Sequence, residues 1–137
     1  MDPVDNLTLA HFLSTPPAGP PPEASIRCAC GRAYYGAHAV VRDALSDAKF
    51  RLPASGEAHG QVINLLKASS DLQVRAVGNL LDQLRATRKS ADYQVGSIPV
   101  TGTAFERRRA AIALAQARSI VEEVERARKV NKRLSIP

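Results

Sequence analysis

Apolar residues recur every three or four positions along four stretches of this chain. The stretches cover about residues 23–48, 57–69, 71–90 and 103–127. Such spacing places the apolar side chains on one face of an α-helix. The pattern therefore predicts four amphipathic helices, and no stretch shows the alternation of apolar and polar residues that is typical of a half-buried strand.

Polar residues that commonly begin helices stand at the start of two of these stretches. Asp71 is the first residue of the third stretch and can accept hydrogen bonds from the first free backbone N–H groups of a helix. Thr103 and Glu106 form a threonine-x-x-glutamate capping box at the start of the fourth. These signals predict where the two helices start.

The N-terminal part of the chain has a different pattern. Asp5 or Asn6 can cap a short helix over residues 7–13. Prolines then dominate residues 16–22 and predict a stiff, extended linker. We therefore expect three parts: a short helix and proline-rich linker (residues 1–22), a helical bundle (23–130) and a basic C-terminal tail (131–137).

Composition favours one helical domain. The chain has 137 residues, enough for a single hydrophobic core. Apolar residues make up 45% and aromatic residues only 4%, with no tryptophan, so the core must consist of alanine, leucine, valine and isoleucine. Small side chains of this kind suit closely packed helices. The predicted fold class is all-α, an up-and-down bundle of four to five helices.

The sequence also predicts the location of the protein and the role of its cysteines. No apolar run is long enough to cross a bilayer, and the first residues are acidic where a secretory signal would be basic. We expect a cytoplasmic protein without membrane contact. Cys28 and Cys30 lie two positions apart on a predicted helix, so their side chains diverge and favour packing roles over a disulfide or zinc site. We predict no metal and no cofactor.

An arginine occupies the apolar face of the helix predicted over residues 71–90. Leu81 and Leu84 are followed at helical spacing by Arg88. An unpaired guanidinium that faces the interior is strongly unfavourable. Asp92 lies one turn further on, where it can pair with Arg88, and Tyr93 follows. This group is either a helix-terminal ion pair with its charge in water or part of a functional site.

Three segments resemble motifs of one known family. Residues 84–93, with Leu-Arg followed by Arg-Lys-Ser-Ala-Asp-Tyr, resemble the Leu-Arg, Arg-x-x-x-Asp-Tyr segment of bacterial HEPN-domain proteins, which are small helical bundles. Residues 32–37 resemble the Arg-Ala-Tyr-Tyr-Ala-Ala of that family, and residues 59–63 resemble its His-Gly-x-Val-Ile. The segments occur in the family's order, and the resemblance covers about residues 26–127.

The resemblance implies a HEPN-like bundle and a set of candidate site residues. HEPN ribonucleases combine an arginine with a histidine four to six positions later, and both contact the scissile phosphate across a dimer. Arg88 matches the arginine, Tyr93 stands five residues later, and His38 stands where the family usually has phenylalanine. The candidate catalytic residues are therefore Arg88, Asp92, Tyr93 and His38. His59, in the first turn of its predicted helix, is expected to make only local hydrogen bonds.

Small residues in the helix predicted over residues 23–48 indicate a close helix contact. Gly31, Gly36 and Ala37 allow another backbone to approach, and Tyr35 lies on the polar and aromatic face of the same helix. Together with the inward-facing arginine, these four residues predict the interface of a homodimer.

Positive charge is concentrated near the C-terminus. Residues 1–103 carry ten basic and nine acidic groups, a net charge of +1, and residues 104–137 carry nine basic and four acidic groups, a net charge of +5. The basic residues form either a solvated helix face or a phosphate-binding surface. In the second interpretation Arg107, Arg108 and Arg109 bind nucleic acid together with Arg88.

The leading hypothesis is a HEPN-like protein that binds RNA or nucleotide phosphate. By resemblance it is the toxin-like member of a toxin–antitoxin or defence pair, with a nucleotidyltransferase-like protein as partner. One alternative is a non-catalytic structural or protein-interaction module, and a second is a divergent metal-independent ribonuclease. Enzymatic activity stays open, because none of the three histidines follows Arg88 at the family's spacing.

Overall fold

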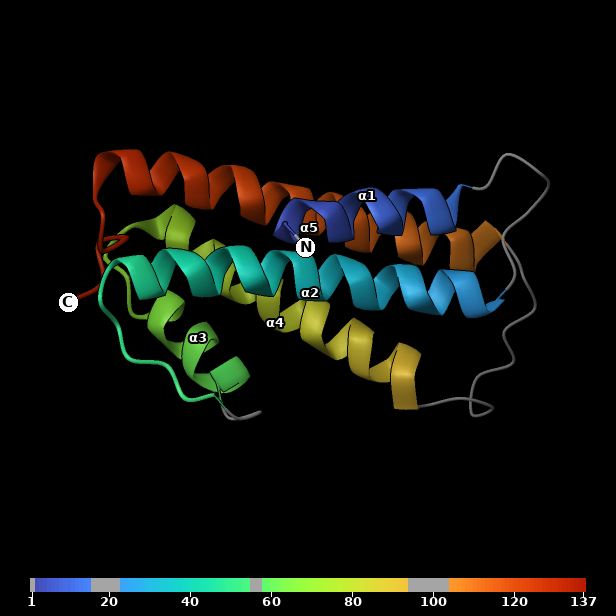
Figure 1. The fold of residues 1–137 in the computed structure, drawn as a ribbon, viewed down its shortest axis with the longest axis horizontal. Coiled ribbons are helices and arrows are strands. Elements are labelled where there is room, and N and C mark those ends of the chain that lie inside the picture. The colour runs from blue at the N-terminus through green and yellow to red at the C-terminus, as the bar shows by residue number, and fades with distance from the viewer. Residues whose placement is uncertain (1, 16–22, 55–57, 94–103) are drawn as a thin grey trace.

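A computed structural model of the protein describes residues 2–15, 23–54, 58–93 and 104–137, without the side chains of residues 23, 92, 93 and 104–107. These residues form helices and no strand, which confirms the predicted all-α bundle (Figure 1). The helices are α1 (Pro3–Ser14), α2 (Glu23–Asp47), α3 (Ala58–Lys67), α4 (Leu72–Tyr93) and α5 (Ala104–Val130). None of them, within the described residues, is long and apolar enough to span a membrane.

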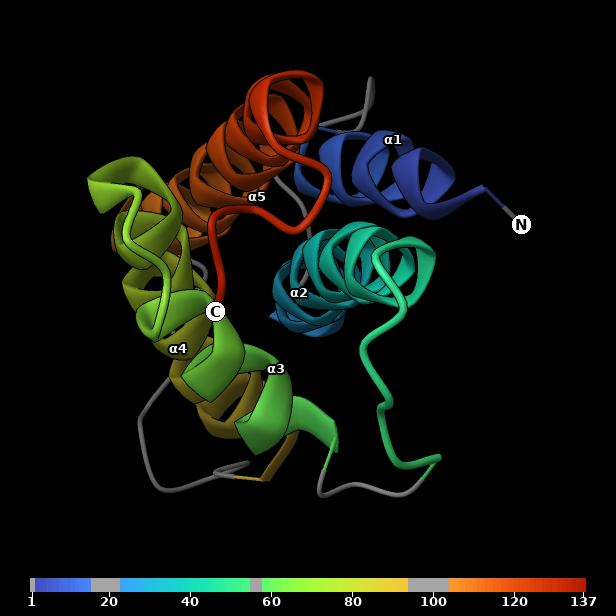
Figure 2. The same cartoon turned by 90° about the vertical axis from the view of Figure 1, so that its left-hand side faces the viewer.

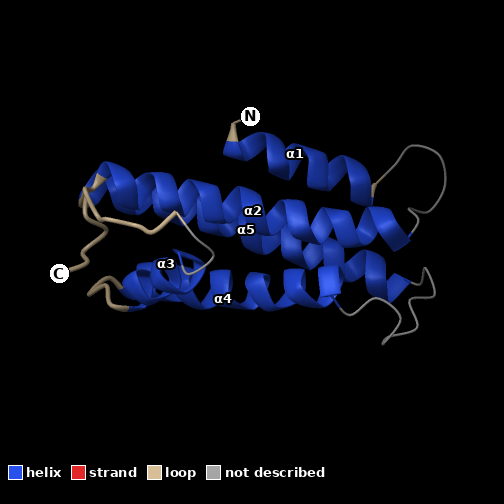
Figure 3. Cartoon of the chain, turned by 60° about the horizontal axis from the view of Figure 1, so that its bottom comes forward, coloured by secondary structure: helices blue, strands red, loops and turns tan. Residues whose placement is uncertain are grey.

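Helix α2 is the centre of the bundle and contacts every other helix. α1 packs on α2 and α5, and α3 packs mainly on α4. The view along the bundle shows α1, α5, α4 and α3 arranged around α2 (Figure 2). In the side view, α1 and α4 run opposite to α2 and α5, as in an up-and-down bundle (Figure 3).

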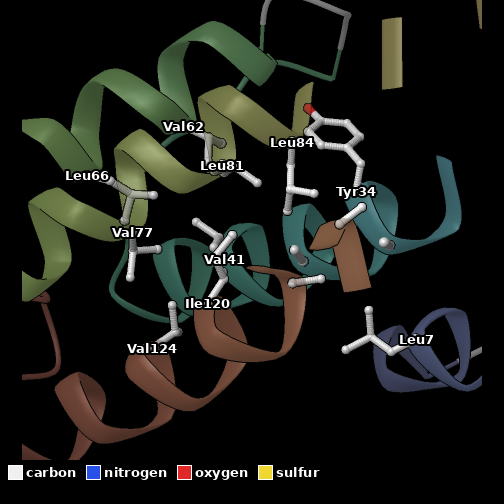
Figure 4. Packing of buried hydrophobic residues seen from close by; sticks show 14 of the residues in the cluster. Leu7, Tyr34, Val41, Val62, Leu66, Val77, Leu81, Leu84, Ile120 and Val124 are labelled. Atoms are coloured by element: carbon white, nitrogen blue, oxygen red, sulfur yellow. The ribbon is translucent and has the colours of Figure 1, made fainter. Parts of the chain in front are cut away.

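The core follows the apolar pattern of the sequence. Seven apolar residues recur at helical spacing in the stretch predicted over residues 23–48. All seven are buried, and four of them are alanines: Ile26, Cys30, Ala33, Ala37, Val41, Ala44 and, just after the end of α2, Ala48. Larger side chains from the other helices pack on this narrow face, including Leu7, Val62, Leu81 and Ile120 (Figure 4). Small residues on α2 therefore allow its neighbours to approach closely.

Helix α1 lies unusually close to α2 at Gly36. A Cβ atom at this position would lie 2.9 Å from Leu7 Cδ2 and 3.0 Å from the carbonyl oxygen of Pro3. Gly31 and Ala37 are also buried within the single chain. At Gly36 the close neighbour is α1 of the same chain, and of the four predicted interface residues only Tyr35 is exposed.

The start of α1 differs from the prediction. The helix begins at Pro3 and is capped by Asp2, whose side chain accepts a hydrogen bond from Val4 N at 2.9 Å. Asp5 is the reciprocal partner in this capping box and accepts from Asp2 N at 3.2 Å. The predicted cap at Asp5 or Asn6 was therefore wrong. Proline is favoured at the first position of a helix, and α1 starts at Pro3, before the apolar residues from which its start was predicted.

The starts of the later helices follow their polar signals where the structure describes them. Asp71 caps α4 and accepts from Gln73 N at 2.9 Å, as predicted. Its other carboxylate oxygen accepts from Arg126 of α5 at 3.2 Å. The predicted cap at Thr103 lies outside the described residues. Cys28 is exposed and Cys30 is buried, and neither forms a disulfide.

The segment after α5 folds back and closes one end of the bundle. Leu134 and Ile136 are buried, although they lie beyond the last helix. The Ser69 hydroxyl donates to the Leu134 carbonyl at 2.6 Å, and Ser70 N donates to the Ser135 carbonyl at 2.9 Å. We call residues 131–137 the C-terminal clasp.

Candidate functional site

Side chains from three helices meet in one polar and aromatic cluster. α2 contributes two tyrosines, a histidine and an arginine, α3 contributes a histidine, and α4 contributes two arginines. The members are Tyr34, Tyr35, His38, Arg42, His59, Arg85 and Arg88. We call this set the cationic cluster. It draws residues from all three segments on which the family resemblance rests.

Aromatic contacts hold α2 and α3 together within the cluster. Tyr34 is fully buried, and its hydroxyl forms a hydrogen bond with His59 Nδ1. The rings of His38 and His59 stack with their centroids 4.3 Å apart and an interplanar angle of 28°. His59 was expected to make only local hydrogen bonds. That expectation was wrong, because its partner lies 25 residues earlier in the chain.

The arginines approach these rings from α4 and α2. The guanidinium carbon of Arg88 lies 5.1 Å from the centroid of the Tyr35 ring and 5.8 Å from that of Tyr34. Such distances allow cation–π attraction. Arg88 is thus partly buried against α2, in agreement with its predicted place on the inner face of α4.

Arg85 and Arg42 extend the positive charge of the cluster. The Nε atom of Arg85 is buried and has no hydrogen-bond partner among the described residues. Arg42 donates from Nη2 to the Pro53 carbonyl at 3.2 Å, which holds the chain after α2 against the cluster. Arg85 and Arg88 lie about one turn apart, so both face the same side of α4.

Burial keeps His38, His59 and Tyr34 in their uncharged forms at neutral pH. Burial, with further effects of His59, Arg42 and Arg85, lowers the pKa of His38 to about 4. Burial and the nearby arginines also lower the pKa of His59. Burial raises the pKa of Tyr34 to about 12 despite the opposing effect of the arginines. At neutral pH the net charge of these groups therefore comes from guanidinium.

The cluster has the chemistry of an anion site. Guanidinium groups present N–H donors in a planar fork that matches the oxygens of phosphate. Neutral imidazoles and a protonated phenol add hydrogen-bonding groups without adding negative charge. His38 is 7% exposed, and its Nε2 atom has no hydrogen-bond partner in the described part of the chain.

The predicted catalytic residues divide into two groups. Arg88 and His38 both belong to the cationic cluster. Asp92 and Tyr93 belong to the last turn of α4, but their side chains lie outside the description, so their pairing with Arg88 stays a prediction.

No described contact joins the predicted nucleic-acid-binding arginines of α5 to the cationic cluster. Arg108 is exposed and Arg109 is partly buried, and no described interaction joins either residue to Arg88. The side chain of Arg107 lies outside the described residues. A surface shared by these arginines and Arg88 stays a prediction.

Four members of the cluster were not among the predicted site residues: Tyr34, Arg42, His59 and Arg85. All of them except Arg42 stand inside a segment that resembles the family, and that position was the available signal. The described residues contain no group of three histidine, cysteine or acidic side chains that could hold a metal ion. Comparison of the chain with protein-family models, curated proteins and solved structures finds no significant match.

Proposed function

We propose that this protein binds RNA or nucleotide phosphate at the cationic cluster. The observation that carries the proposal is the convergence of three arginines on uncharged rings. Arg85 and Arg88 come from α4 and Arg42 from α2, and all three lower the pKa of a histidine in the cluster. Because guanidinium stays protonated at neutral pH, the positive charge of the cluster does not depend on protonation of its histidines.

The burial of the cluster strengthens this electrostatic argument. Charges interact more strongly in a partly buried site than in bulk water, because the effective dielectric constant is lower. The Nε atom of Arg85 is a buried donor without a partner among the residues that the structure describes, and such a donor is costly to leave unsatisfied. A bound phosphate oxygen would provide the missing acceptor. Phosphate esters therefore fit the site better than neutral ligands.

Fluorescence anisotropy with labelled RNA and inorganic polyphosphate tests the proposal in low salt. Arg85→Gln should weaken the binding of both ligands by about tenfold or more, since a charge-assisted hydrogen bond contributes about 1.5–3 kcal/mol. Arg118→Gln removes the same charge from an exposed position on α5 and is the matched control. Affinity should also fall steeply as salt increases.

Two results would contradict the proposal. Absence of binding to both ligands at low salt would favour the non-catalytic structural module, in which the cluster only joins α2, α3 and α4. An equal loss of affinity in the two arginine variants would show that overall charge, and not the cluster, attracts the ligand. Circular dichroism spectra of the variants establish that each remains folded.

A divergent metal-independent ribonuclease is the second candidate function. It is favoured by His59, a neutral imidazole that is hydrogen-bonded to Tyr34 and lies near arginines. A neutral imidazole can accept the proton of an RNA 2′-hydroxyl, and arginine can stabilise the charge of the phosphorane. RNA cleavage in the presence of a chelator, lost in His59→Asn, would support this candidate. Intact RNA would contradict it.

The resemblance extends the proposal to partners. We propose that the protein forms a homodimer and acts as the toxin-like member of a toxin–antitoxin or defence pair with a nucleotidyltransferase-like protein. Light scattering at tens of micromolar protein tests the dimer, and a monomer would contradict it. Copurification with the product of a neighbouring nucleotidyltransferase gene tests the pair.

A further inference from the structure

Tyr35 is the tyrosine of the cationic cluster that reaches the surface. The residue is 39% exposed, whereas the preceding residue, Tyr34, is fully buried. Tyr34 contacts the Tyr35 ring edge to face at a centroid distance of 5.4 Å and an interplanar angle of 64°. His59 contacts it at a steeper angle of 72°. The ring is thus positioned by its neighbours while much of it remains in water.

A guanidinium group lies over the same ring. The Arg88 carbon is 5.1 Å from the Tyr35 centroid, so the ring and a positive charge are next to each other. Single exposed aromatic residues are common on protein surfaces and carry no functional meaning by themselves. Phe12 of α1 is such a residue, with 60% exposure. What distinguishes Tyr35 is that its ring lies at the edge of a cluster of arginines.

We propose that Tyr35 stacks on a nucleobase, and that the site therefore takes single-stranded nucleic acid. This inference rests on the proposed function and specifies its ligand. In a single strand a base can leave its neighbours and stack on an aromatic side chain. In a duplex each base is already stacked between its neighbours. The adjacent Arg88 would contact a phosphate of the same strand while the base covers Tyr35.

Stacking on Tyr35 requires an unpaired base in the ligand, whereas phosphate binding requires only negative charge. Inorganic polyphosphate offers charge but no base, and a duplex offers charge with its bases occupied. Only an unpaired strand can use the arginines and the Tyr35 ring together. These three ligands therefore separate the inference from the proposed function.

Anisotropy measurements with three variants of the complete chain test the inference. The ligands are an unstructured RNA of about 12 nucleotides, the same RNA annealed to its complement, and inorganic polyphosphate. Tyr35→Leu removes the π-face, and Tyr35→Phe keeps it. Phe12→Leu removes an exposed aromatic ring from α1, a helix that contacts neither α3 nor α4 in the described residues.

The wild type should bind the single strand at least about fivefold more tightly than the duplex. Tyr35→Leu should weaken single-strand binding by about fivefold or more, and Tyr35→Phe and Phe12→Leu should change it by less than about twofold. Binding of polyphosphate should be similar in all four proteins. A thermal melt of each variant establishes that it is folded.

Each contrary result has a separate meaning. Unchanged single-strand binding in Tyr35→Leu, or equal binding of duplex and single strand, overturns the inference. If polyphosphate still binds and Arg85→Gln still weakens that binding, the proposed function survives this failure. If the wild type binds none of the three ligands, the inference and the proposed function fail together.

Discussion

Replacing Gly36 by alanine tests how closely α1 packs on α2. The added methyl group would lie 2.9 Å from Leu7 Cδ2 and 3.0 Å from the Pro3 carbonyl oxygen, and both distances are shorter than ordinary van der Waals contact. The leucine side chain can rotate, but the carbonyl belongs to the backbone of α1. We therefore expect the substitution to displace α1 from α2 and to destabilise the folded protein.

Two opposing effects set the size of the change. Alanine favours the helical backbone over glycine by about 1 kcal/mol in the interior of a helix. Overpacking of a buried contact costs about 1–3 kcal/mol. The expected net loss of stability for Gly36→Ala is thus up to about 2 kcal/mol.

Gly60→Ala is the matched control for the preference of alanine over glycine in a helix. Its added methyl group would meet only the Nη1 atom of Arg85, at 3.9 Å, which is an ordinary contact. Because Gly60 lies in the first turn of α3, the substitution should increase stability by about 0.5 kcal/mol. Compared with this control, Gly36→Ala should therefore be less stable by about 0.5–2.5 kcal/mol.

Urea denaturation followed by circular dichroism measures both variants. The midpoint of Gly36→Ala should fall below that of the wild type with an unchanged slope, and the midpoint of Gly60→Ala should rise slightly. If Gly36→Ala were as stable as Gly60→Ala, the reasoning would be refuted, because α1 could not then be packed closely against α2 at Gly36.

Two further predictions concern pH and the C-terminal clasp. The pKa of His38 is about 4 in the folded protein and 6.5 when unfolded, so stability should be complete above pH 6.5 and fall as the pH drops from 6.5 towards 4. Between pH 7.5 and 5 the contribution of His38 to this loss should be about 2 kcal/mol in urea denaturation, so the loss should be smaller by about that amount in His38→Phe; equal losses would contradict the pKa shift. Ser69→Ala should cost about 1–3 kcal/mol, because the hydroxyl donates to Leu134 and accepts from Asp71 N in a buried setting; an unchanged thermal midpoint would contradict that role.

The sequence predicted features that depend on the periodicity of a single helix. The buried face of α2 and the inward position of Arg88 on α4 both follow from residues three and four positions apart. The cap at Asp71 follows from its position immediately before the apolar pattern. Each of these predictions requires knowledge of only one helix.

Contacts between helices could not be predicted in the same way. Gly36 indicates that some backbone lies close by, but the residue itself does not say whether that backbone belongs to α1 or to a second chain. The partnership of Tyr34 and His59 depends on how α3 packs against α2, which no local spacing encodes. The cationic cluster therefore became complete only when three helices were placed together.

The C-terminal clasp has a consequence for the order in which this protein can fold. Ser69 and Ser70, at the end of α3, bond to Leu134 and Ser135, which follow 65 residues later. During synthesis the ribosome releases the N-terminal part of this pair long before its partner. The hydrogen bonds that join the α3–α4 junction to the C-terminal clasp can therefore form only after the residues that follow α5 have been synthesised, and forming them closes a loop of 65 residues.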